Sequence, residues 1–107
     1  MTVEVLESTI AIDNEGYENQ ESFTVIETIK RVDKQPLSGE IAEKEYGISN
    51  ANIKFRLFIT EPSNYINEDS ENTKIRIGSK FYTIRAVRDW NIHKEAVIEP
   101  YKEVTVV

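Results

Sequence analysis

The chain has 107 residues, of which 39% are hydrophobic and 30% charged, and its 13 basic and 19 acidic side chains give a net charge of −6. This length suits a single domain, residues 1–107, and the composition lies well outside that of disordered chains. The absence of cysteine excludes disulfides and thiolate zinc sites, the single histidine argues against histidine-based metal sites and catalytic relays, and no apolar run approaches the ~20 residues of a membrane span.

The first third of the chain predicts two strands separated by a polar loop. We expect residues 1–7 to form a mobile arm without a signal-peptide pattern, and residues 8–12 to form the first strand. Residues 22–33 predict a long strand in which Val25 and Ile26 interrupt the alternation of apolar and polar side chains. Such a break indicates either two covered faces or a β-bulge.

A short helix is predicted at residues 39–46. Ser38 is a favourable N-cap, Gly47 is a natural residue to follow the last turn, and Pro36 ends the preceding strand. The apolar stripe of this helix, formed mainly by Ile41 and Tyr46, is thin. A helix of two turns needs tertiary contacts, so we expect it to be loosely held.

The second half of the chain predicts a strand at residues 52–60, a long polar loop at 61–72 and a β-meander at 73–101. The meander consists of three strands joined by two tight turns, with Pro100 ending the last strand. The tail, 102–107, can add an edge strand. Together these elements predict a mainly-β fold, a small β-barrel of about six strands with one short inserted helix.

Chemical motifs are absent from the sequence. It has no nucleotide-binding loop, no nucleophile elbow and no calcium loop with the required spacing. We therefore expect no catalytic, cofactor-binding or metal-binding residues, no cofactor and no enzyme activity. His93 is expected to be an exposed turn residue, and Trp90 either caps the core or anchors a partner.

Basic residues alternate with aromatic ones along the predicted strands, and this pattern has two interpretations. It is typical of a β-barrel that binds single-stranded nucleic acid, and it also suits an outer sheet face that meets a neighbouring subunit. Residues 1–50 carry 11 acids and 4 bases, a net −7, whereas residues 51–107 carry 8 acids and 9 bases, a net +1. This asymmetry favours head-to-tail contact between subunits. The expected interface residues are Lys54, Arg56, Lys74, Arg76, Arg85, Arg88 and Trp90.

The order of these elements, together with one hairpin, resembles a known family. The hairpin KIRIGSKFYTI at residues 74–84 has the pattern basic, any, basic, apolar, Gly, then Lys, aromatic and a later Ile. In this respect the chain resembles the head-closure proteins of long-tailed bacteriophages, also called stoppers or head–tail connector proteins. The resemblance covers about residues 8–101.

The resemblance implies a structural component of the virion neck, made in the host cytoplasm. Such proteins form a ring, twelvefold in the family, below the portal and adaptor, where they close the DNA-filled head and dock the tail. The segment between the second and following strands, here 35–51, projects toward the channel, and acidic residues there would repel passing DNA without reading its sequence. The implied channel residues are Pro36, Ser38, Glu40, Ile41, Glu43, Glu45 and Tyr46.

Three alternatives remain open from the sequence. The loop at 61–72 is a second candidate for the channel or the tail contact. The chain could also be a tail-completion or tail-terminator-type neck protein. In a different class, it could be a β-barrel that binds single-stranded nucleic acid, which salt-dependent binding to an oligonucleotide would reveal.

Overall fold

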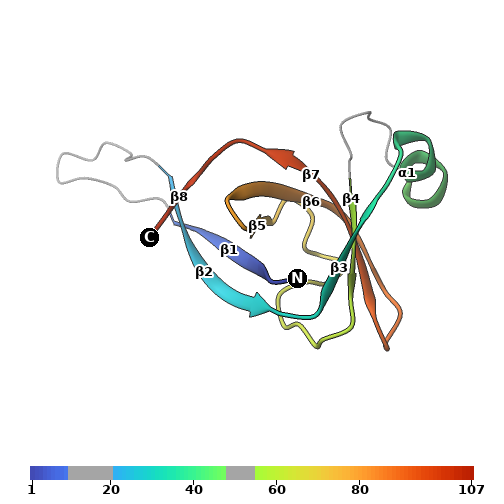
Figure 1. The fold of residues 1–107 in the computed structure, drawn as a ribbon, viewed down its shortest axis with the longest axis horizontal. Helices are drawn as coiled ribbons and strands as arrows, with labels where there is room; N and C mark the ends of the chain where they lie inside the picture. The colour runs from blue at the N-terminus through green and yellow to red at the C-terminus, as the bar shows by residue number, and fades with distance from the viewer. Residues whose placement is uncertain (10–20, 48–54) are drawn as a thin grey trace.

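The computed structural model describes residues 1–9, 21–47 and 55–107 (Figure 1). Its eight strands form one curved antiparallel sheet in the order β3-β4-β7-β6-β5-β1-β2-β8, apart from a short parallel pairing of β8 with β2. The elements are β1 (Val3–Thr9), β2 (Ser22–Ile29), β3 (Val32–Pro36), α1 (Gly39–Tyr46), β4 (Phe55–Ile59), β5 (Lys74–Ile77), β6 (Lys80–Asp89), β7 (Lys94–Tyr101) and β8 (Thr105–Val106).

The prediction of a mainly-β domain with one short helix is confirmed, and the helix has the predicted bounds. The sheet rolls around its core, but its end strands β3 and β8 are not paired with each other in the described part of the chain (Figure 1). The fold is therefore an open, rolled sheet rather than a closed barrel. It has two more strands than predicted, because the predicted strand at 22–33 divides into β2 and β3 and because the tail supplies β8.

Residues 3–9 form β1 instead of the predicted mobile arm. Val3 and Val5 are fully buried, while Glu4 between them faces the other side and pairs with Arg76 of β5. The alternation of valine with glutamate is the period of a half-buried strand. The strand therefore starts earlier than predicted, and most of residues 8–12 lies outside the described residues.

The predicted long strand at 22–33 is two strands. Between β2 and β3, the backbone N–H groups of Lys30 and Arg31 donate to a Glu61 carboxylate oxygen, at 3.1 and 3.2 Å. These bonds satisfy donors that leave the ladder at the turn. Of the two outcomes expected from Val25 and Ile26, a β-bulge is present in β2, where Ile26 has no partner because Val5 lies opposite Glu27 and Leu6 opposite Val25.

The meander has the predicted order and turns. Gly78 and Asn91 adopt positive φ, +62° and +71°, in the two turns. Pro100 does not end β7 as predicted. It lies opposite Tyr82 of β6, beyond Ile98, the last residue of β7 paired with β4 in the described chain. A proline is tolerated where a strand has a neighbour on one side only.

The core fills the concave side of the sheet. Ile66 is also fully buried, although it belongs to the loop at 61–72 and to no strand. This loop therefore closes one end of the rolled sheet with an apolar side chain. The buried cluster consists of Val3, Val5, Ile29, Val32, Leu57, Ile59, Ile66, Ile75, Tyr82, Ile84, Ala96 and Ile98. Among the described residues, no helix has the length and apolar character needed to cross a membrane.

Candidate functional site

The helix α1 begins and ends as its sequence predicts. Ser38 Oγ accepts a hydrogen bond from the backbone N–H of Ile41 at 3.2 Å, which satisfies one of the free donors of the first turn. Gly47 adopts the left-handed conformation at φ +67°, and its N–H donates to Glu43 O at 3.1 Å. The helix lies beside β3 and β4, outside the curve of the sheet (Figure 1).

Few apolar contacts hold α1 on the sheet. Ala42 is fully buried and packs with Leu37 against Val97 of β7 in a cluster separate from the core. Ile41, which the sequence suggested as part of the docking stripe, is 44% exposed. The docking face is therefore centred on Ala42, one position further along, and an alanine methyl buries little apolar area.

Polar contacts at the end of α1 complete the attachment. Tyr46 Oη donates to Glu95 Oε1 of β7 at 2.9 Å and accepts from Arg56 Nη1 of β4 at 3.3 Å. The same Arg56 nitrogen lies 3.4 Å from Glu45 Oε2 and 3.6 Å from Glu95 Oε1. Burial raises the pKa of Tyr46, and the hydrogen bond to Tyr46 raises the pKa of Arg56. We call Tyr46, Arg56 and Glu95 the α1 triad.

Glu95 also joins the triad to the turn between β6 and β7. His93 Nε2 lies 3.4 Å from Glu95 Oε2, and the His93 ring stacks on Phe58 with ring centres 4.4 Å apart. Burial opposes ionisation of Glu95, but hydrogen bonds from Tyr46, His93 and Trp90 outweigh it and hold its pKa below the ordinary value. His93 is therefore a partly buried, stacked residue, and the prediction of an exposed turn histidine is wrong.

Trp90 is 51% exposed and does not cap the core. Its ring centre lies 6.3 Å from that of His93. The neighbouring Ile92 is 83% exposed. Of the two interpretations of Trp90, the structure rejects the core cap.

The predicted channel residues lie on α1 and on the chain that leads into it. Glu40, Glu43 and Glu45 are exposed, so the helix presents three carboxylates to solvent. Pro36 ends β3 and Ser38 caps the helix, whereas Tyr46 faces the sheet. The segment thus has an acidic outer face and an attached inner face.

The predicted interface residues separate into two groups. Arg56 and Arg88 contact Tyr46 at the end of α1, with the Arg88 guanidinium 4.6 Å from the centre of the Tyr46 ring, and Trp90 lies beside His93 and Glu95. The other group is engaged within the sheet: Arg76 forms a two-point ion pair with Glu4, at 2.7 and 3.0 Å, and Arg85 pairs with Glu99 at 2.9 Å. Lys54 lies outside the described residues. Much of the positive charge of the sheet is therefore neutralised within the chain.

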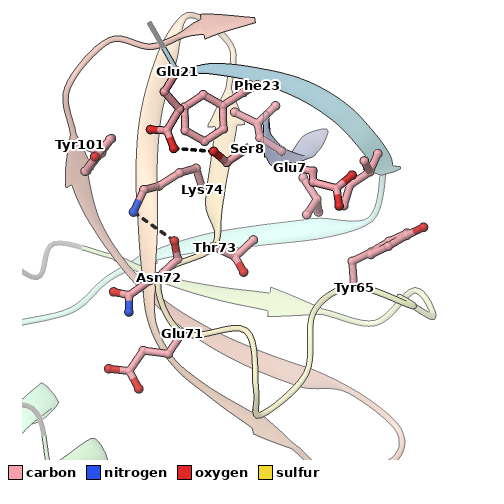
Figure 2. Close-up of a pocket in the computed structure, with 13 residues that line it drawn as sticks. Glu7, Ser8, Glu21, Phe23, Tyr65, Glu71, Asn72, Thr73, Lys74 and Tyr101 are labelled. Atoms are coloured by element: carbon pink, nitrogen blue, oxygen red, sulfur yellow. Dashed lines mark hydrogen bonds between the residues drawn. The ribbon is translucent and has the colours of Figure 1, made fainter. Parts of the chain in front are cut away.

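Lys74 lines a hollow of about 560 Å³ that is formed by residues of β1, β2 and β5 and of the loop at 61–72 (Figure 2). Its ammonium donates to Asn72 O and Thr83 Oγ1, both at 3.0 Å, and lies 4.2 Å from the Tyr101 ring centre. Burial lowers the pKa of Lys74. The carboxylates of Glu7, Glu21 and Glu71 also line the hollow.

The hollow does not combine groups for a recognisable reaction. Its one serine, Ser8, is hydrogen-bonded to Glu21, and His93 is not among its lining residues (Figure 2). In the described part of the chain, no three His, Asp or Glu side chains are arranged to hold a metal ion. We therefore centre the candidate site on α1.

The loop at 61–72 is fastened at several points. Glu27 accepts hydrogen bonds from Ser63 Oγ and from the Asn64 N–H, and Lys94 Nζ donates to the carbonyls of Ser63 and Ile66. With Ile66 fully buried, this loop is more firmly attached than α1.

No family model matches this chain. None of the curated proteins matches it either.

Sequence reasoning missed Glu95, Ala42 and Gln35, which accepts a hydrogen bond from Arg56 at 3.3 Å. Glu95 can be placed near Arg56 only once the register of β4 and β7 is known. In that register it lies opposite Phe58, and therefore on the same face as Arg56.

Proposed function

We propose that this chain is a structural subunit of a bacteriophage neck, which forms a ring below the portal and adaptor, closes the DNA-filled head and offers the tail a docking surface. The observation that carries the proposal is α1. It is inserted between β3 and β4, presents an acidic face to solvent, and is held on the sheet by a small contact.

The charge on α1 suits a channel through which DNA moves. Glu40, Glu43 and Glu45, repeated around a ring, would place a belt of carboxylates facing the phosphate backbone. Like charges repel, so DNA would pass without binding. A weakly docked segment can also change position at low cost, whereas a tightly packed one cannot.

The attachment of the second candidate segment supports the same assignment. The loop at 61–72 buries Ile66 and is fastened to Glu27 and Lys94. Moving that loop would expose a core side chain and break several hydrogen bonds. Of the two segments considered for the channel, α1 is therefore the better candidate.

The nucleic-acid-binding alternative is less favoured, because it needs free cations along the strands. Arg76 and Arg85 are paired with carboxylates of neighbouring strands. Binding a phosphate backbone through these residues would first require breaking those pairs, which reduces the gain from counterion release.

The test is the mass of the purified chain, alone and mixed with its cognate portal–adaptor complex, measured by native mass spectrometry and electron microscopy. We expect a ring on the complex.

The variant Glu40→Gln/Glu43→Gln should still assemble, because the two carboxylates face the channel and not the neighbour. Glu68→Gln/Asp69→Asn, which removes the same charge from the exposed part of the fastened loop, is the matched control. A chain that ignores the complex but shifts a labelled oligonucleotide would refute the proposal.

A further inference from the structure

With α1 docked on the sheet, the hydrogen bonds of the Arg56 guanidinium are long, although carboxylates lie close to it. Its contacts to Tyr46 Oη, Glu45 and Gln35 measure 3.3, 3.4 and 3.3 Å. Charge-assisted bonds of this kind are ordinarily about 2.7–2.9 Å long. Arg56 Nε is buried and has no hydrogen-bond partner among the residues that the structure describes. An unsatisfied buried donor carries a free-energy cost.

A better partner for Arg56 is close by. Glu95 lies on the same face of the sheet, two positions along the β4–β7 register, and its Oε1 is 3.6 Å from Arg56 Nη1. In the docked state this oxygen accepts the hydrogen bond from Tyr46 at 2.9 Å. Tyr46 thus competes with Arg56 for Oε1, and a two-point pair of Arg56 with Glu95 would share Oε2 with His93, whose Nε2 lies 3.4 Å from it. Arg76 and Glu4 form such a pair elsewhere in the same sheet.

We propose that the α1 triad is a two-state latch, in which Arg56 binds α1 through Tyr46 and Glu45 when the helix is docked and pairs fully with Glu95 when the helix is released. The backbone hydrogen bonds of the sheet are the same in both states, and the changes are confined to α1 and to the side chains of Arg56 and Glu95. This inference concerns the chain by itself and does not depend on the proposed role in a phage neck.

The remaining contacts of α1 make release inexpensive. The apolar part of the attachment consists of Ala42 and Leu37 against Val97, with Tyr46 and Ala86 at the margin. The helix is only eight residues long, so it is marginal without tertiary contacts and its backbone hydrogen bonds open once it has left the sheet. The core cluster around Leu57 and Ile98 contains no residue of α1. Release of the helix therefore leaves the core intact.

The test is amide hydrogen exchange by NMR on the complete chain. The Ala42 and Gly47 amides, which donate to Ser38 O and Glu43 O, report on α1, and the Ile84 amide, which donates to Thr73 O, reports on the sheet. We expect the α1 amides to exchange at least a hundredfold faster than Ile84, after correction for intrinsic rates, because they open without global unfolding.

The variant Tyr46→Phe should shift the latch toward release. It removes the hydroxyl that holds both Arg56 and Glu95, so exchange at Ala42 and Gly47 should rise about tenfold. Exchange at these two amides should still depend less on urea than exchange at Ile84, because release of α1 exposes less surface than unfolding of the domain. The Arg56 Hε resonance should move downfield as Nε gains a carboxylate acceptor. Tyr65→Phe is the matched control, because Tyr65 is 46% exposed on the fastened loop and should change neither set of amides.

Two results would overturn the latch. One is exchange of the α1 amides at the rate of Ile84 in the unaltered protein, which would mean that the helix opens only with the whole domain. The other is an equal dependence of the two sets of amides on urea in Tyr46→Phe, which would mean that the α1 amides exchange only through global unfolding. The variant Arg56→Lys provides a second check. It keeps the charge but removes the two-point geometry of the guanidinium, so it should also accelerate the α1 amides without raising their dependence on urea.

Discussion

The hydroxyl of Tyr46 lies 2.9 Å from Glu95 Oε1 and joins the last residue of α1 to β7, 49 positions further along the chain. Through Glu95 the helix is also connected to His93 and to the turn that presents Trp90. One carboxylate thus links the acidic helix to the turn that carries an exposed aromatic side chain. The predictions below test the parts of this arrangement separately.

Acid should destabilise the protein through Glu4 and Glu95. Hydrogen bonding from Arg76 holds the pKa of Glu4 below its ordinary value of 4.5, and the pKa of Glu95 is also lowered. Because both pKa values are lower in the folded state, the stabilisation is complete above about pH 4.5 and is lost as the pH falls through the lowered values. Urea unfolding midpoints measured between pH 7 and pH 3 should show this decline.

The variants Glu4→Gln and Glu95→Gln should each reduce the dependence of the midpoint on pH. Glu103→Gln, an exposed residue outside the strands, is the control and should leave the slope as it is. An unchanged slope in both of the first two variants would contradict the assignment of the acid-sensitive groups.

Truncation of Ile66 should damage the whole domain. Ile66 is fully buried in the core cluster although it lies in a loop. The change Ile66→Ala should lower the free energy of unfolding by about 2–5 kcal/mol, the range for a buried isoleucine that leaves a cavity. Tyr65→Ala at the exposed neighbouring position should cost less than about 1 kcal/mol. Chemical denaturation measures both values, and equal losses would show that the loop does not close the core.

Features that depend on residues close together in the sequence could be predicted, and features that depend on distant residues could not. The bounds of α1 were predictable because Ser38 and Gly47 act within one turn of the helix. The meander was predictable because its turns and alternating side chains are close in sequence. The bulge at Ile26 could be anticipated as one of two outcomes, since two adjacent apolar residues disturb a period of two.

Long-range pairings could not be predicted in the same way. Arg76 and Arg85 appeared to be available for a partner, because their ion pairs with Glu4 and Glu99 depend on which strands lie side by side. The burial of Ile66 depends on where its loop crosses the end of the sheet. For α1 the sequence pattern indicated the wrong docking residue, because Ile41 is more apolar than Ala42 but faces solvent.

Loss of either cap should loosen α1 more than the sheet. Ser38→Ala removes the N-cap acceptor and should cost about 1 kcal/mol of helix stability. Gly47→Ala should cost about 1 kcal/mol through its positive φ alone, because nothing lies within 4 Å of the added Cβ. Gly78→Ala, at a similar φ in the β5–β6 turn, is the comparison and should affect the sheet instead. Site-resolved hydrogen exchange distinguishes the two results.

Binding to single-stranded DNA should be weak. Since Arg76 and Arg85 are paired within the sheet, we expect little change in the fluorescence anisotropy of a labelled oligothymidine, with a shallow dependence on salt. The variants Arg76→Ala and Arg85→Ala should alter this signal little. Tight binding that falls steeply with salt would favour the nucleic-acid-binding alternative.

The most direct test of the proposed function is the retention of DNA in phage heads that lack this chain. Heads carrying portal and adaptor are filled with DNA and treated with nuclease, with and without the purified protein, and the protected DNA is measured. We predict that DNA leaks and is digested without the protein and stays protected when it is added. Equal protection in both samples would contradict a role in closing the head.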